Sequence, residues 1–321
     1  MEIVIADPAK NITIFVLDPI AGGPERTETA KALLADPSLK AEQVGFVLPP
    51  ALSGPGDGRA YWRLEMMGGE FCGNAARSFG LFVARETGLK GRHTVMIEIS
   101  GMKEPLPVNV DCLRRVHTPP LWGVIKGMDP ETDTLPKQPY PIRSAAGLVD
   151  TEAGRAEVEI PRPLAQGSLS FEGHTLPVFV FDGITHVLAP GLKPDRDTFF
   201  AIKEGVRHHF DAGRPVAAER SPDALGVMFY DIQKQFMQPA VYVVATDSLV
   251  FESSCGSGSA ALALWKTADI RDEEGRCDVA PVIWRAAQPG GIIEVKVSKH
   301  NGEISSIAIG GPVGLSGRMR V

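Results

Sequence analysis

The chain has 321 residues, of which 44% are hydrophobic and 22% charged, and its formal net charge at pH 7 is -6. This composition supports a packed core in about two domains and argues against wholesale disorder. The negative charge argues against nucleic acid or an anionic membrane surface as a partner. No apolar run has the length that crosses a bilayer, and residues 1–18 do not resemble a signal peptide, so we expect a cytoplasmic protein.

Short strand-like segments dominate the chain. Each is rich in Val, Ile, Phe or Tyr and is bounded by Gly, Pro, Asp or Asn. The predicted strands are residues 2–6, 11–17, 44–48, 61–66, 94–99, 156–160, 176–181, 227–231, 240–245, 248–252, 292–297 and 304–309. Because many connections are too short for a crossover helix, we expect antiparallel pairing.

Four segments are predicted to be helical. Residues 26–35 and 195–204 have the alternation of a peripheral amphipathic helix, whereas residues 73–86 and 256–267 are apolar on nearly every face. A helix that is apolar all round must be buried. The pattern therefore predicts an α+β fold in which two β-rich lobes each surround one buried helix.

The expected division places the N-terminal lobe at residues 1–163 and the C-terminal lobe at residues 164–312. Residues 313–321 would return as a last strand to the first lobe. A proline-rich segment at about 113–146 interrupts that lobe, and we expect it to be a surface excursion.

Two similar cysteine clusters open the buried helices. They are "GGEFCGNAARSFG" at 68–80, which contains Cys72, and "SCGSGSAALAL" at 254–264, which contains Cys255. The N–H groups and dipole at a helix start favour negative charge, so we expect a lowered thiol pKa and an anion site for a carboxylate. Gly73 and Gly256 would let a ligand approach the backbone.

The other cysteines, Cys112 and Cys277, are interpreted as structural buried thiols. None of the four lies in a C-x-x-C pair, and the seven histidines show no metal-ligand spacing, so no metal site is expected. The two motif cysteines could form a redox disulfide, but that would need Cα atoms within about 7 Å and would leave no room for a substrate carbon.

Two thiols that face each other across a cleft can invert a carbon. One thiolate removes a proton while the opposite thiol delivers a proton to the other face. Backbone amides aimed at a substrate carboxylate would stabilise the developing enolate.

At these residues the chain resembles the diaminopimelate epimerase-like fold family of cofactor-independent amino acid racemases and epimerases. The resemblance implies two pseudo-symmetric lobes, each a curved antiparallel sheet wrapped around a central helix, with an amino acid bound between them. It implies that Cys72 and Cys255 are the two bases and that no cofactor, pyridoxal phosphate included, is used. The backbone amides of Gly73, Asn74, Gly256 and Ser257 would hold the α-carboxylate.

Further positions match the family in order along the chain. Asn11 in "KNITIFV" and Gln43 in "EQVGFV" resemble an early asparagine and glutamine of the family, and His186 in "GITHV" resembles its histidine. The stretch "IGGPV" at 309–313 resembles a late Thr-Gly-Pro strand end. The resemblance alone implies that Asn11, Gln43 and His186 belong to the substrate site.

This chain differs from the diaminopimelate epimerases at positions that would contact the distal end of the substrate. Diaminopimelate epimerases carry a Glu-Arg pair where this chain has Thr246 and Asp247, and Glu65 stands about where they have an asparagine. A site that loses an arginine and gains carboxylates should reject a second carboxylate. The pattern is similar to the histidine racemases of this fold, which supply D-histidine for opine-type metal-chelating molecules. Glu65, with Glu252 or Asp247, would then hold the imidazole or the amino group.

Several alternatives stay open. They are a diaminopimelate epimerase, a proline or hydroxyproline racemase (which normally has histidine where this chain has Asn74), and a phenazine-biosynthesis isomerase, which lacks the second cysteine. A non-catalytic amino-acid-binding protein would bind its ligand without exchange at the α-carbon. The expected partner is a small-molecule amino acid substrate, and the oligomeric state, a homodimer included, is left open.

Overall fold

The computed structural model describes residues 1–48, 61–112, 154–211, 223–244, 247–268 and 281–321. The predicted segment at 113–146 and Cys277 lie outside these residues. The described helices are α1 (Pro24–Ala35), α2 (Gly73–Glu86), α3 (Arg196–Asp211) and α4 (Gly256–Lys266). The strands are β1 (Glu2–Asp7), β2 (Thr13–Val16), β3 (Gln43–Leu48), β4 (Trp62–Met66), β5 (Gly91–Ile99), β6 (Leu106–Cys112), β7 (Gly154–Glu159), β8 (Ala165–Phe171), β9 (His174–Phe181), β10 (Ile184–Pro190), β11 (Ala224–Asp231), β12 (Phe236–Val243), β13 (Ser248–Phe251), β14 (Val282–Gln288), β15 (Gly291–His300), β16 (Glu303–Leu315) and β17 (Met319–Arg320).

The described strands form one hydrogen-bonded sheet, and the fold is α+β as predicted. Most neighbouring strands are antiparallel, but the pairs β2–β3, β4–β5, β10–β11 and β12–β14 are parallel. The expectation of antiparallel pairing is wrong for these pairs. Each of them has a helix in its connection, because parallel neighbours need a crossover: α1, α2, α3 and α4 in turn.

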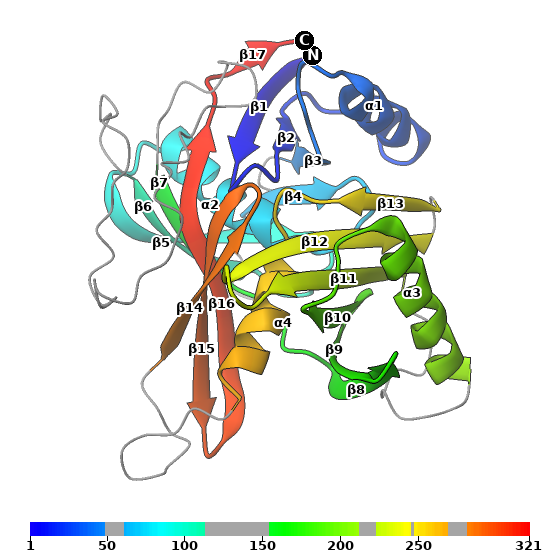
Figure 1. The fold of residues 1–321 in the computed structure, drawn as a ribbon. Coiled ribbons are helices and arrows are strands. Elements are labelled where there is room, and N and C mark those ends of the chain that lie inside the picture. Colours follow the sequence, from blue (N-terminus) through cyan, green and yellow to red (C-terminus); the bar gives the residue numbers. More distant parts are fainter. Residues whose placement is uncertain (49–60, 113–153, 212–222, 245–246, 269–280) are drawn as a thin grey trace.

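Strand β16 ties distant parts of the sheet together. It pairs with β15 along its first half, with β7 from Ala308 to Val313, and with β1 at Gly314 and Leu315. Figure 1 shows it running through the middle of the molecule. The division into residues 1–163 and 164–312 stays a prediction, and its last boundary falls inside this strand.

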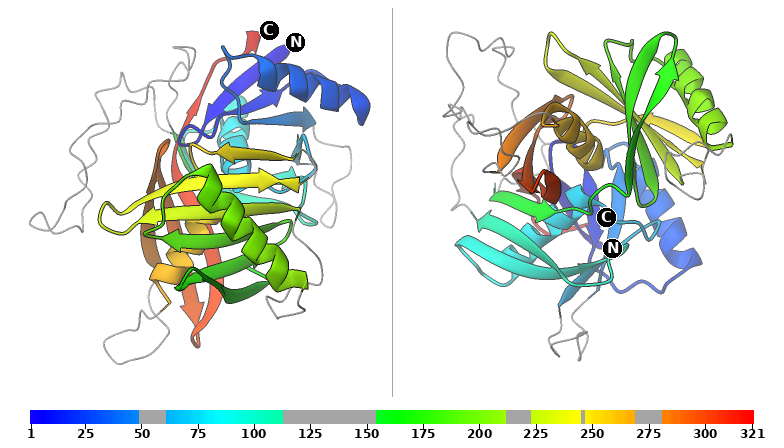
Figure 2. Two further views of the ribbon diagram at one scale, coloured as in Figure 1. Left: turned by 45° about the vertical axis from the view of Figure 1, so that its right-hand side comes forward. Right: turned by 90° about the horizontal axis from the view of Figure 1, so that it is seen from below.

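The helices differ in burial as their sequences predict. Helix α2 packs against β5, β6, β7 and β16, and α4 packs against β10, β11, β14, β15 and β16. Both contribute to one continuous apolar cluster. Helices α1 and α3 lie on the outside of the sheet, each over a separate cluster (Figures 1 and 2). No described helix is long and apolar enough to cross a membrane.

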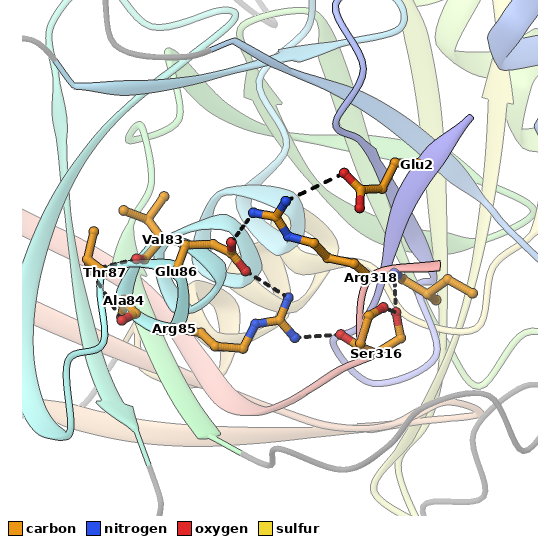
Figure 3. A network of polar contacts seen from close by, with 10 residues as sticks. Glu2, Val83, Ala84, Arg85, Glu86, Thr87, Ser316 and Arg318 are labelled. Atoms are coloured by element: carbon orange, nitrogen blue, oxygen red, sulfur yellow. Dashed lines mark hydrogen bonds and ion pairs between the residues drawn. The ribbon is translucent and has the colours of Figure 1, made fainter. Parts of the chain in front are cut away.

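The C-terminal end of α2 is fixed to both chain termini (Figure 3). Arg85 donates to the Ser316 carbonyl, and Glu86 pairs with Arg318, which also lies 3.5 Å from the Glu2 carboxylate. The helix ends at Glu86 with Thr87 as its C-cap, and Gly88 follows with φ 74°, the left-handed conformation that glycine adopts without strain. This end of the helix is therefore held while its other end carries Cys72.

Candidate active site

Cys72 and Cys255 are the N-caps of α2 and α4, as the two motifs predict. The Cys72 sulfur accepts from the Ala75 N–H at 3.4 Å, and the Cys255 sulfur accepts from the Gly258 N–H at 3.4 Å. Their backbone angles are nearly equal, with φ -125° and ψ 114° at Cys72 and φ -127° and ψ 117° at Cys255. The two thiols thus occupy equivalent positions on two helices.

The two helix starts meet against one side chain of β16. A Cβ built on Gly73 would lie 2.6 Å from Ile309 Cδ1, and a Cβ on Gly256 would lie 2.8 Å from the same atom. The Gly256 position is also 3.7 Å from Asn74 Oδ1 on the other helix. The two contacts with Ile309 Cδ1 are shorter than any real Cβ contact, so a side chain at either position would force Ile309 or the helix to shift. The first residues of α2 and α4 therefore lie close together, against the same side chain of β16.

Cys72 is half-buried and faces Gln43 at the start of β3. Its thiol donates to Gln43 Oε1 at 3.0 Å, which brings together two of the predicted site residues. Burial raises the pKa of Cys72 to about 11. The expectation that the helix start lowers this pKa is wrong, because the cost of desolvating a thiolate exceeds the contribution of the N–H groups.

Cys255 is buried and lies among different groups. Its backbone N–H donates to Gln288 Oε1 at 2.8 Å, and its sulfur lies 3.7 Å from Ser257 Oγ. Burial and the nearby Glu252 carboxyl raise the pKa of Cys255 well above its usual range. The expected lowering is wrong here too, and the thiol form dominates at neutral pH.

Two carboxyl groups lie on the Cys255 side of the site. Glu252 bonds to the Cys255 thiol, and burial together with the charge of Glu42 raises the pKa of Glu252 to about 8. Glu42 accepts from Asn11 Nδ2 at 2.6 Å, and burial raises its pKa as well. Among the described residues, no lysine or arginine forms an ion pair with either carboxyl.

Asn11 and Asn74 link the first helix start to strand β2. Asn74 Nδ2 donates to Asn11 Oδ1 at 3.1 Å, and Arg77 Nε donates to Asn74 Oδ1 at 3.1 Å. All three side chains are buried. The predicted pair of asparagines is therefore held in one orientation by a chain of hydrogen bonds.

His186 is fully buried on β10 and contacts the second helix start. Its Nε2 lies 2.8 Å from Ser257 Oγ, which connects two further predicted residues. Burial lowers the pKa of His186 to about 3, so the ring is neutral at physiological pH. Its Nδ1 would lie 2.2 Å from a Cβ on Gly226, so the missing side chain of that glycine makes room for the ring.

The two remaining acids that the sequence singled out are not brought to the cysteines. Glu65 pairs with Arg26 of α1 and lies 3.6 Å from Arg63. Asp247 accepts from the Tyr242 hydroxyl. Both carboxylates are thus occupied by other side chains.

Three residues of this region were missed from the sequence. Glu42 directly precedes β3 and begins the stretch "EQVGFV", in which only Gln43 was singled out. Gln288 reaches the site from the end of β14, and no local pattern marks it. Arg77 could have been found, because it is the one cation in the apolar stretch "NAARSFGLFVA". Cys112, expected to be structural, lies half-buried against the main cluster. The described residues contain no group of three His, Cys, Asp or Glu placed to hold a metal ion.

Comparison with known proteins places this geometry in a family. The family model for the histidine racemase CntK N-terminal domain matches residues 1–118 and 150–320. A histidine racemase from Fusobacterium nucleatum subsp. nucleatum is 26% identical over 263 residues, covering 82% of this chain and 80% of the relative. A histidine racemase from Staphylococcus aureus strain Mu50 is 23% identical over 314 residues, covering 95% and 94%.

The solved structures show the same fold. A structure described as a predicted epimerase from Pseudomonas aeruginosa matches with a TM-score of 0.57 and 12% sequence identity, covering 100% of this chain and 99% of that chain. The chain belongs to the family of the histidine racemase CntK N-terminal domain and is an isomerase that acts on amino acids.

Proposed function

We propose that the protein is a histidine racemase that inverts the α-carbon with two cysteines, Cys72 and Cys255. The observation that carries the proposal is that both cysteines cap helices whose first residues meet against Ile309. In this proposal a planar enolate lies between the two helix starts, and one sulfur approaches each of its faces. The named relatives, at 23–26% identity, support histidine as the substrate.

The reaction follows from the groups at the two helix starts. The N–H groups of Gly73, Asn74, Gly256 and Ser257 hold the α-carboxylate and stabilise the negative charge that develops when the α-proton leaves. One cysteine takes the α-proton as a thiolate, and the other gives its proton to the opposite face as a thiol. Each turnover thus moves one proton onto the first sulfur and one proton off the second.

The carboxyl groups beside Cys255 support a cationic substrate. Glu252 and Glu42 have no basic partner among the described residues, and each has a raised pKa because burial and the neighbouring acid disfavour charge. A bound ammonium or imidazolium supplies the missing positive charge and ionises both. Of the acids that the sequence suggested, Glu252 is therefore assigned to substrate binding and Glu65, which pairs with Arg26, is not.

The same proposal covers the division into lobes, the cellular location, the cofactor and the use of the product. Residues 1–163 and 164–312 form two pseudo-symmetric lobes with the substrate between them, and the protein is cytoplasmic. It uses no cofactor. Its D-histidine product serves the assembly of a metal-chelating molecule.

Proton NMR in deuterated water tests the proposal. The protein is incubated with single L-amino acids, namely histidine, diaminopimelate, proline, arginine, lysine and serine, and loss of the α-proton signal is followed. We expect exchange with histidine, none with diaminopimelate, and loss of exchange in both Cys72→Ala and Cys255→Ala. Cys112→Ala is the matched control, because this half-buried thiol lies outside the site, and it should keep the wild-type rate.

The outcomes separate the candidate functions. Exchange of diaminopimelate at a rate similar to histidine contradicts the substrate assignment. Saturable binding without exchange identifies a binding protein. Exchange that survives removal of either cysteine contradicts the two-thiol mechanism.

A further inference from the structure

Arg77 is the largest side chain that is completely buried in the described residues. It lies on α2, five positions after Cys72. Its Nη1 donates to the carbonyls of Gly311 at 3.3 Å and Pro312 at 3.2 Å, both on β16. Its Nε donates to Asn74 Oδ1. The guanidinium therefore connects the first helix start with the strand that carries Ile309.

The charge of Arg77 has no carboxylate in contact. Asp7 and Glu294 act on it only from a distance, and Arg155 opposes them. Its Nη2 is buried without a hydrogen-bond partner among the described residues. Burial lowers the pKa of Arg77 to about 10, so the group is still cationic at neutral pH. A buried, unpaired cation is costly and strongly favours a negative charge nearby.

The nearby group that can become negative is Cys72. A thiolate at Cys72 lies within electrostatic reach of Arg77 and favours its charged form. Because Coulomb attraction is mutual, the cation also favours the thiolate. The other groups that face Cys72 are the neutral Gln43 amide, the N–H groups of Asn74 and Ala75, and the Glu70 carboxylate, which opposes ionisation. Arg77 is the cation that interacts with this thiolate, and it also holds the side chain of Asn74, whose N–H faces Cys72.

The second helix has the opposite arrangement. Five positions after Cys255 stands Ala260, which is buried and carries no charge. The groups that face Cys255 are the Glu252 carboxyl, the Ser257 hydroxyl and the Gly258 N–H. The equivalent thiols of two similar helices thus differ in charge environment, with a cation behind one and an acid beside the other.

We propose that the buried guanidinium of Arg77 makes Cys72 the first of the two thiols to ionise, so that Cys72 is the base and Cys255 the acid in the ligand-free enzyme. The assignment of base and acid rests on the proposed two-thiol reaction. The order of ionisation does not, since it is a property of the protein without substrate. Arg77 is a positioning residue in this account, because it acts through Cys72 and Asn74 and does not touch the substrate.

Alkylation of each thiol by iodoacetamide over a range of pH tests the order, because only the thiolate reacts. Peptide mass spectrometry reads Cys72 and Cys255 separately in the same ligand-free sample. In the wild type we expect the alkylation of Cys72 to reach its half-maximal rate at a lower pH than the alkylation of Cys255. In Arg77→Gln its midpoint should rise by about one pH unit or more, while that of Cys255 stays in place. Arg77→Lys keeps the positive charge and should keep most of the difference between the pH midpoints of Cys72 and Cys255.

A midpoint for Cys255 that lies below the midpoint for Cys72 in the wild type overturns the proposal. This result does not depend on the folding of any variant. An unmoved Cys72 midpoint in a folded Arg77→Gln also overturns it, since a purely structural arginine would leave the midpoint unchanged. Circular dichroism reports the folding of both variants. Absence of α-proton exchange in a wild-type sample that shows the expected order contradicts the proposed function and leaves the order of ionisation supported.

Discussion

Cys72 and Cys255 share backbone geometry but not neighbours. The thiol of Cys72 donates to an amide oxygen, whereas that of Cys255 faces a carboxyl group with a pKa of about 8. The glycine-rich sequence around each cysteine predicts that the cysteine stands at the start of a helix. The neighbours come from strands far along the chain, as with Gln288, which accepts from the Cys255 N–H. Local sequence does not show how deeply the folded chain buries the two thiols, and desolvation is the reason that the predicted lowering of the thiol pKa failed.

His186 should remain neutral across the physiological range. Burial lowers its pKa from 6.5 to about 3, so the folded protein excludes a proton that the unfolded chain binds. The stabilisation from this group is present above about pH 6.5 and is lost as the pH falls toward about 3. Ring NMR signals followed between about pH 5 and 8 should show no titration for His186. A midpoint near 6.5 for this ring would contradict its burial.

Glu252 should make stability depend on pH in the opposite direction. Its pKa rises from 4.5 to about 8, so the folded protein keeps a proton that the unfolded chain releases. This stabilisation is complete below about pH 4.5 and is lost as the pH rises through about 8. Urea denaturation at about pH 5, 7 and 8.5 should show that decline in the wild type and a weaker one in Glu252→Gln. The exposed Glu28→Gln should keep the wild-type decline; equal slopes in all three would contradict the assignment.

At the scale of elements, the contact between the two helix starts can be tested with methyl groups. Gly256→Ala should lower kcat/KM about tenfold or more, because its Cβ would meet Ile309 Cδ1 at 2.8 Å and displace α4. Ile309→Val removes that atom and should restore part of the activity of Gly256→Ala. The rescue should be smaller for Gly73→Ala, whose Cβ also meets Ile160 Cγ2 at 3.1 Å.

The matched control for this series is a glycine with room around it. Gly205→Ala on α3 places its Cβ at 3.6 Å from Leu169, an ordinary contact, so activity should be unchanged. Wild-type activity in Gly256→Ala would contradict the close approach of the helix starts. The absence of any rescue by Ile309→Val would assign the loss to another contact.

The sequence predicts the helices better than the strands. The buried helices α2 and α4 begin where the cysteine motifs place them, since a continuous apolar run leaves little choice. Strand β8 (Ala165–Phe171) was missed because Gly, Ser and Gln occupy most of it. Strand β6 (Leu106–Cys112) alternates buried and exposed residues, but Pro107 and Asn109 on its exposed face hide the strand signal.

At the scale of the whole molecule, β16 and the chain ends close the sheet. The terminal ammonium donates to the Val321 carbonyl at 2.8 Å, and Arg318 holds Glu86 and Glu2 at the end of α2. Arg318→Ala should lower the free energy of unfolding by about 1 kcal/mol or less, because the pairs are partly exposed. Hydrogen exchange should rise in β1 and β17 alone. Faster exchange throughout α2 would contradict a local role for this network.

The central claim is that two thiols act on opposite faces of one α-carbon. The most direct measurement is the position of deuterium early in the conversion of L-histidine by the wild-type protein in deuterated water. Two separate bases place solvent deuterium in the D-histidine formed, while the remaining L-histidine keeps its α-proton. Deuterium that enters both enantiomers equally from the start would show a single base that serves both faces, and would contradict the account.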